Sequence, residues 1–215
     1  NQNTLFRLEE DPGVGTYIFN SKDMNLASHI QEIMDSGAVD SLKIEGRTKS
    51  PYYAAVTANA YREAIDDYYA DTFDADKYQR ELHTTKNRGF TDAYLVHRPF
   101  EKNDSQNHEY AISKGSYEVT GLITEDEKHF MCKYKVYPNQ DIEIFPPRNC
   151  DIVECDNEIG KIFKNEDGVY YINFKKILTE TNKEMESVHS GNTNKIQLPG
   201  KLPYLTMLRT ENTEI

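Results

Sequence analysis

Cysteine is scarce in this sequence, with three residues among 215. Cys132, Cys150 and Cys155 are too few for a disulfide framework, so we expect a reducing, cytoplasmic location. The pair Cys150 and Cys155 could ligate a metal ion, but its spacing fits no common zinc site. Buried strand cysteines are the favoured interpretation, and we expect no metal ligands in this chain.

Long apolar runs are also missing. No stretch approaches the roughly 20 apolar residues that a membrane helix needs, and no charged and apolar leader opens the chain. We therefore expect no membrane partner. The first residue is Asn rather than Met, so either an initiator is left out or the sequence is a piece of a longer protein.

Positive charge is in deficit: 25 Lys and Arg against 36 Asp and Glu give a net charge of −11. This balance argues against a nonspecific nucleic-acid binder or a binder of anionic membranes, because both need a positive field. Local basic patches remain compatible with it. Their candidates are Lys43, Arg47 and Lys49 in the first half and Lys133, Lys135, Lys175 and Lys176 in the second.

The usual local signatures of enzymes are absent. The sequence contains no G-x-S-x-G, H-E-x-x-H, Walker or Rossmann glycine pattern. A peptidase needs a nucleophile with a base, or an activated water, and no residue pattern here marks such a group.

The segment Ser41–Tyr53, SLKIEGRTKSPYY, is the most informative one present. Alternation over Ser41–Glu45 predicts a strand, Gly46 ends it, and Ser50 with Pro51 predicts a helix start. Charged residues at the end of a strand line the cleft of α/β folds. An exposed strand with a surface Lys and Glu pair is an equally open interpretation.

The first half is expected to follow a β-α-β-α order. A strand at Thr16–Phe19 is followed by a helix that ends at Gly37, the strand Ser41–Glu45 and a helix from Pro51 to about Tyr69. This order predicts that the two strands are parallel neighbours. A short helix is expected near Tyr78–Thr84. The predicted buried stripe of the long helix is Ala54, Ala58, Tyr61, Ile65 and Tyr69.

From Tyr117 the apolar period changes to two, and turn residues separate short runs. This pattern predicts a small antiparallel barrel that folds by itself. Thr179 to Asn194 is expected to be a long loop or an excursion. The predicted strands are Tyr117–Ile123, Lys128–Lys135, Asp141–Phe145, Cys150–Glu154, Gly160–Lys164, Val169–Phe174, Ile196–Leu198 and Tyr204–Arg209.

Two stretches resemble the collagenase-like peptidase family, family U32. They are Gly15 to Tyr69, with GTYIFNSKD, LKIEGRTKSPYY and AYREAIDDY, and Asn87 to Tyr110, NRGFTDAYLVHRPFEKNDSQNHEY. The resemblance is strongest to members that hydroxylate the wobble uridine of transfer RNA, with prephenate implicated. It covers the first half closely and the barrel more loosely.

The resemblance implies the fold class α/β plus all-β. Residues 1–110 would be the terminal βα units of a modified (β/α)8 TIM barrel, and residues 111–215 a small antiparallel β-barrel domain. The family's iron-sulfur cysteines would lie upstream of this sequence, in the missing N-terminal half. No cofactor is therefore expected within the chain, which we expect to be inactive alone.

The resemblance also sets the expected site and its partners. The partners are tRNA and a small, prephenate-like carboxylate, which Arg47 would bind through paired hydrogen bonds. A collagenase-like peptidase and a noncatalytic module that binds tRNA or a protein are the alternatives. We assign catalysis to Lys43, Glu45 and Arg47, and substrate binding to Asn20, Lys22, Lys49, Tyr52 and Arg88.

Overall fold

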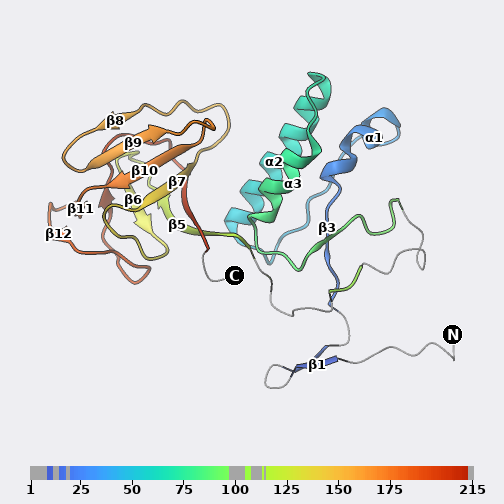
Figure 1. Ribbon diagram of the computed structural model, residues 1–215, viewed down its shortest axis with the longest axis horizontal. Helices are drawn as coiled ribbons and strands as arrows, with labels where there is room; N and C mark the ends of the chain where they lie inside the picture. Colours follow the sequence, from blue (N-terminus) through green and yellow to red (C-terminus); the bar gives the residue numbers. More distant parts are fainter. Residues whose placement is uncertain are drawn as a thin grey trace. The chain divides into compact units, whose positions relative to one another are not determined.

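The computed structural model describes residues 20–96, 105–107, 113 and 115–212, and the backbone of residues 9–11 and 15–17. The chain divides into two compact units, Asn1–Ser116 and Tyr117–Ile215. The order of elements is mixed α/β followed by an antiparallel sheet (Figure 1). The coarse fold class predicted from the sequence is therefore confirmed.

The helices of the N-terminal unit begin where local capping allows it. The helical turn η1 (Ala27–His29) leads into α1 (Ile30–Asp35), and Gly37 follows with a φ of +60°. Helix α2 (Pro51–Tyr69) begins at Ser50, whose hydroxyl accepts a hydrogen bond from the Tyr53 N–H at 3.2 Å. The predicted cap and Pro51 entry are both confirmed.

Helix α3 (Ala75–His83) begins three residues before the predicted Tyr78–Thr84, because Asp74 caps it through the N–H groups of Asp76 and Lys77. Figure 1 shows α3 alongside α2. The predicted stripe of α2 was partly wrong. Ala54, Ala58 and Tyr69 are exposed, while the buried residues are Tyr52, Val56, Thr57, Ala60 and Ala64.

The strands of the N-terminal unit pair differently from the prediction. Strand β2 (Gly15–Tyr17) forms an antiparallel hairpin with β1 (Glu9–Asp11). The parallel pair is instead β3 (Asp23–Met24) with β4 (Phe90–Thr91). The predicted parallel pairing of Thr16–Phe19 with Ser41–Glu45 was therefore wrong.

Ser41–Glu45 itself is not a strand but an irregular segment. Leu42 and Ile44 are 37% and 43% exposed. The apolar side chains of the alternating pattern therefore do not pack against an apolar surface. No strand among the described residues pairs with this segment. An isolated strand leaves its backbone groups to water and gains little from its side chains.

The core of the N-terminal unit lies between η1, α1, α2 and α3. Tyr78 is fully buried in it, and its hydroxyl donates a hydrogen bond to Asp67 at 2.7 Å. Small residues on α2, Ala60 and Ala64, allow the helices to approach closely. The buried members of this cluster are Ala27, Ile30, Ile33, Ala60, Ala64, Tyr78 and Leu82.

The C-terminal unit is built on one eight-stranded antiparallel sheet, which curls as a half-barrel (Figure 1). Its strand order is β13-β6-β5-β14-β7-β10-β9-β8. The strands are β5 (Tyr117–Ile123), β6 (His129–Cys132), β7 (Asp141–Phe145), β8 (Cys155–Asp156), β9 (Gly160–Lys164), β10 (Tyr170–Phe174), β13 (Ile196–Gln197) and β14 (Met207–Glu211).

A side-chain to backbone hydrogen bond connects the segments that follow the two edge strands of this sheet. The Asn157 amide donates a hydrogen bond to the Pro199 carbonyl at 2.6 Å, which joins the turn after β8 to the loop after β13. The predicted strand Cys150–Glu154 was wrong, since those residues are irregular and the ladder begins at Cys155. The excursion predicted after Thr179 contains β12 (Glu184–Met185), which pairs with β11 (Ile177–Leu178).

The concave face of the sheet carries one continuous apolar core. Ile142, Ile162 and Ile172 are almost fully buried, as strand alternation requires. The rings of Phe130 and Phe174 meet inside it, with centroids 5.4 Å apart. Among the helices of the described part, none combines the length and apolar character that crossing a bilayer requires.

Candidate functional site

The carboxylate of Asp23 gathers two of the predicted binding residues. Lys49 Nζ lies 3.0 Å from Asp23 Oδ2, and Arg88 Nη2 lies 3.0 Å from Asp23 Oδ1. The Arg88 N–H also donates to Oδ2 at 3.3 Å. We call Asp23, Lys49, Tyr53 and Arg88 the Asp23 cluster. It forms because parallel pairing of β3 with β4 brings Asp23 beside Arg88, the second residue before β4.

Two cations, Lys49 and Arg88, share the single carboxylate of Asp23 in this cluster. Burial acts to raise the pKa of Asp23, but hydrogen bonds from Lys49 and Arg88 outweigh it and lower the pKa. Asp23 is therefore ionised at neutral pH. One positive charge remains uncompensated within the cluster, so a second anion would be stabilised there.

Tyr53 links the cluster to the KIEGR segment. Its hydroxyl donates to the Glu45 carbonyl at 3.2 Å, and Lys49 Nζ lies 5.3 Å from its ring centroid. A Cβ on Gly46 would lie 2.7 Å from Tyr53 Cε1, so only glycine allows this close approach. Burial raises the pKa of Tyr53, and the charge of Asp23 raises it further.

The three residues assigned to catalysis do not converge. Lys43 and Glu45 form an ion pair of 2.9 Å with side chains 86% and 73% exposed. The surface pair that the alternative interpretation expected is present, but the segment that carries it is not a strand. Arg47 is exposed, and in the part of the chain that the structure describes its guanidinium contacts no carboxylate. The roles assigned to these residues stay predictions.

The remaining predicted binding residues have different surroundings. Asn20 is tied to residues 105–107, where its amide donates to the Asn107 carbonyl at 3.0 Å. Lys22 runs along Gly89, whose φ is +82°. Tyr52 is buried and donates to the Thr84 hydroxyl at 2.8 Å, so it packs between α2 and the end of α3. The structure therefore brings together only Lys49 and Arg88, through Asp23.

Asp23 is the residue that the sequence analysis missed. The stretch Asn20 to Asp23 has the composition of a polar helix cap, and its partners Lys49 and Arg88 are far along the chain. The available signal was a lone acidic residue between an apolar run and the next helix. That signal is weak, because caps have the same composition.

The cysteines do not fit the iron-sulfur cluster that the family resemblance implies. Cys132 is buried, Cys150 is exposed and Cys155 is half-buried. Burial raises the pKa of the Cys132 thiol to about 11, which disfavours the thiolate that a cluster needs. Within the described residues, no three potential metal ligands gather. We derive no step of a reaction through such a cluster.

Residues 2–105 match the model of peptidase family U32, so the resemblance to this family that the sequence analysis stated is confirmed for that part of the chain.

The relatives that this chain matches include tRNA hydroxylation proteins and a collagenase. The tRNA hydroxylation protein P of Helicobacter pylori is 52% identical over 207 residues, which cover 96% of this chain and 49% of the relative. The protein of that name from Escherichia coli is 39% identical over 62% of this chain and 30% of its own length. A collagenase of Porphyromonas gingivalis is 38% identical over 37% of this chain and 23% of its own length.

The chain spans about half the length of the Helicobacter pylori relatives that it matches. No solved structure matches it.

Proposed function

We propose that this chain acts in the hydroxylation of tRNA, as part of a longer protein. One observation carries the proposal: the 52% identity to tRNA hydroxylation protein P extends over 96% of this chain and so includes both units. The wobble uridine is the proposed target. The proposed location is the cytoplasm.

The proposed role of the N-terminal unit is to hold a small carboxylate, of the prephenate type. Lys49 and Arg88 have one carboxylate between them, and Arg47 is exposed on the segment that Tyr53 fixes. A guanidinium can bind a carboxylate through two parallel hydrogen bonds, which a lysine cannot reproduce. Arg47 is therefore the proposed anchor, with Lys49 and Arg88 supplying positive charge.

Two further parts of the proposal concern the longer protein. The parallel pair β3 and β4 would belong to a modified (β/α)8 barrel, in which residues outside this chain supply neighbouring strands. Any iron-sulfur cluster would be ligated by residues outside this chain. These proposals follow from the family resemblance and from the lengths of the relatives.

A collagenase-like peptidase is the second candidate, favoured by the similarity to the Porphyromonas gingivalis collagenase. The Asp23 cluster gives it little support, because Asp23 is paired with two cations and, among the described residues, accepts no hydrogen bond from a hydroxyl or thiol that it could activate as a nucleophile. A noncatalytic module that binds tRNA or a protein is the third candidate.

The test is mass spectrometry of tRNA from a strain that lacks the gene for this protein. The proposal expects loss of hydroxylated wobble uridine and its return when the gene is restored. Unchanged hydroxylation would refute it, and a simultaneous loss of collagen-peptide cleavage would favour the peptidase.

Variants of Arg47 test the site separately from the function. Arg47→Ala removes a bidentate contact and is expected to lower hydroxylation roughly thirtyfold or more. Arg47→Lys should not restore it. Arg62→Ala is the matched control, because Arg62 is exposed and pairs only with Asp66 on its own helix in the described part. Full activity of both Arg47 variants would refute the site and leave the function standing.

A further inference from the structure

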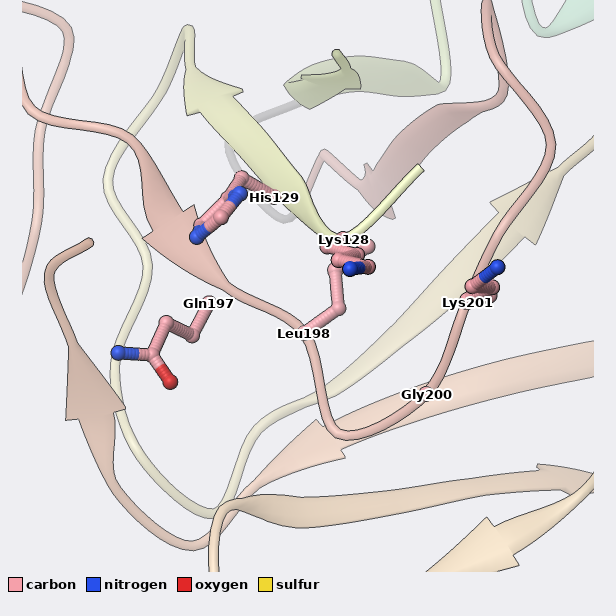
Figure 2. Close-up of a pocket in the computed structure, with 6 residues that line it drawn as sticks. All are labelled: Lys128, His129, Gln197, Leu198, Gly200 and Lys201. Atoms are coloured by element: carbon pink, nitrogen blue, oxygen red, sulfur yellow. The ribbon is translucent and has the colours of Figure 1, made fainter. Parts of the chain in front are cut away.

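A surface pocket of about 280 Å³ lies at one edge of the C-terminal sheet. Its lining residues come from the start of β6, from β13 and from the loop that follows β13 (Figure 2). None of them was assigned to a site from the sequence. They are Lys128, His129, Gln197, Leu198, Gly200 and Lys201.

Backbone hydrogen bonds hold the two walls of this pocket together. The Leu198 N–H donates to the Lys128 carbonyl at 2.9 Å, and the Leu202 N–H donates to the Glu127 carbonyl at 3.1 Å. Lys128 and Lys201 therefore extend from two segments that are fixed side by side. Such a preformed wall lowers the entropy lost on binding.

The loop after β13 is fixed on its other side as well. A Cβ on Gly200 would lie 2.8 Å from Cys155 Sγ, so the loop approaches β8 as closely as only glycine permits. The Pro199 carbonyl accepts the Asn157 amide at 2.6 Å. Lys201 is thus presented by an anchored loop.

Two cations line the pocket without a counterion. Lys128 and Lys201 are exposed, and within residues 115–212 neither ammonium group has a hydrogen-bond or ion-pair partner. Like charges that share one pocket repel each other, and an anion between them relieves the repulsion. This local excess contrasts with the net charge of −11 for the whole chain.

His129 adds an oriented imidazole to the same pocket. Its Nδ1 lies 2.9 Å from Asp126 Oδ2. Backbone hydrogen bonds, first that from Lys128, lower the pKa of Asp126 strongly, so this carboxylate only accepts. Nδ1 therefore carries the proton that is donated to Asp126, and Nε2 is the nitrogen left for a ligand.

Part of this arrangement has a purely structural role. Asp126 also accepts from the Thr124 hydroxyl at 2.8 Å, which fixes the turn between β5 and β6. Gln197 donates to Thr179 and Asn182, so its amide stabilises the excursion that contains β12. Neither role requires Lys128 or Lys201, whose ammonium groups stabilise nothing in the described fold.

We propose that this pocket binds a phosphate group of the tRNA backbone. Lys128 and Lys201 would donate to its oxygens, and the His129 imidazole lines the same pocket beside them. Contacts to backbone phosphate position an RNA and carry affinity without reading its sequence. The inference rests on the proposed function, because tRNA is proposed as the substrate there.

The test measures binding of a synthetic RNA hairpin with the fold of a tRNA anticodon stem-loop. Lys128→Gln with Lys201→Gln is compared with the wild-type protein and with Lys164→Gln and Lys183→Gln, a pair that changes the net charge equally but lies outside the pocket. The pocket pair should weaken binding about tenfold and lower the slope of log affinity against log salt by about 1 to 2. The control pair should change neither. Circular dichroism checks that all variants fold.

Two outcomes would overturn the inference. One is an equal loss of affinity in both pairs, which would mean a general charge effect. The other is unchanged RNA affinity in the pocket pair, even where inorganic phosphate shifts the His129 ring signals in NMR, since the pocket would then take free phosphate rather than RNA. The assay needs no hydroxylation, so it is independent of the tRNA analysis that tests the proposed function.

Discussion

The two units of this chain differ in where their strands find partners. In the C-terminal unit eight strands pair with one another, and a single core fills the concave face. In the N-terminal unit the parallel strands β3 and β4 are two residues long, and Leu42, Ile44 and Met24 are exposed. The eight strands of the C-terminal sheet thus find their partners within that unit, whereas in the described part of the N-terminal unit the buried core lies between helices.

This difference follows from the connections that each kind of sheet allows. Antiparallel strands can be joined by short turns, and β5 with β6, β8 with β9 and β9 with β10 are paired in this way, so part of the sheet is encoded locally. Parallel strands need crossovers, and their neighbours lie far along the chain. We therefore expect the C-terminal unit to unfold cooperatively and at a higher denaturant concentration than the helices of the N-terminal unit.

The largest expected effect is that of Phe174→Ala. Phe174 is fully buried and packs against Phe130, so truncation should lower the free energy of unfolding of the C-terminal unit by about 4 kcal/mol. Urea unfolding followed by NMR amide signals of each unit would measure it. Val153→Ala, at a site that is 75% exposed, should change it by less than about 0.5 kcal/mol. Equal destabilisation of α2 would show that the units are not independent.

The next largest effect concerns an ion pair within the same sheet. Arg209 Nη2 lies 2.5 Å from Glu143 Oε1, both residues are less than 10% exposed, and the guanidinium lies 4.7 Å from the Tyr117 ring centroid. Arg209→Met leaves Glu143 buried without this partner, and should destabilise the unit by about 3 kcal/mol.

The double variant Glu143→Leu with Arg209→Met provides the control. It removes both charges and should be more stable than Arg209→Met alone, because no charge remains unpaired in the sheet. A double variant that is no more stable would indicate that Arg209 acts through packing on its aromatic neighbours. Urea unfolding of the three proteins separates the two explanations.

A smaller effect is expected at the entry of α2 in the N-terminal unit. Ser50→Ala removes the hydroxyl that accepts the Tyr53 N–H and should cost about 1 kcal/mol. Hydrogen exchange in the first turn of α2 would report it. Ser50→Asp should retain most of the stability, because a carboxylate also caps a helix. Equal losses in both variants would contradict a capping role.

The same contrast explains what the sequence could predict. The strands Tyr117–Ile123, Asp141–Phe145 and Gly160–Lys164 were predicted with the bounds that the structure has, because alternation and turn residues are local signals. The Ser50 cap was predicted for the same reason. Ser41–Glu45 was wrong, since alternation indicates a strand only where a neighbour and an apolar surface exist to receive it.

The candidate site was predicted only in part. Lys49 and Arg88 were assigned to binding, and the structure joins them, but the joining residue Asp23 lies 26 and 65 positions away from them. Tyr52 was assigned through its place in the motif and is a core residue. Composition cannot show which charges converge when parallel pairing, rather than a local turn, brings them together.

The smallest expected effect concerns the pH dependence of stability, which tests whether Asp23 is stabilised by the charges of Lys49 and Arg88. The pKa of Asp23 is lowered in the folded state from its ordinary value of 3.8, because Lys49 and Arg88 outweigh its burial. A carboxylate with a lowered pKa stabilises the fold above the unfolded pKa, and this contribution disappears as the pH falls through the folded pKa. Wild-type protein should therefore be more stable than Asp23→Asn at pH 6, and the difference should shrink below about pH 4.

The background variant Lys49→Met sharpens this test. It removes the first of the two cations that lower the pKa of Asp23, so the difference between Asp and Asn at position 23 should become smaller, and its loss with falling pH should be complete at a higher pH. Urea unfolding of the four proteins, followed at amide signals of β3 and α2, would measure both changes. A difference that stays constant between pH 6 and pH 2 would mean that Asp23 acts through hydrogen-bond geometry alone, and the charge argument for an anion site beside it would lose its basis.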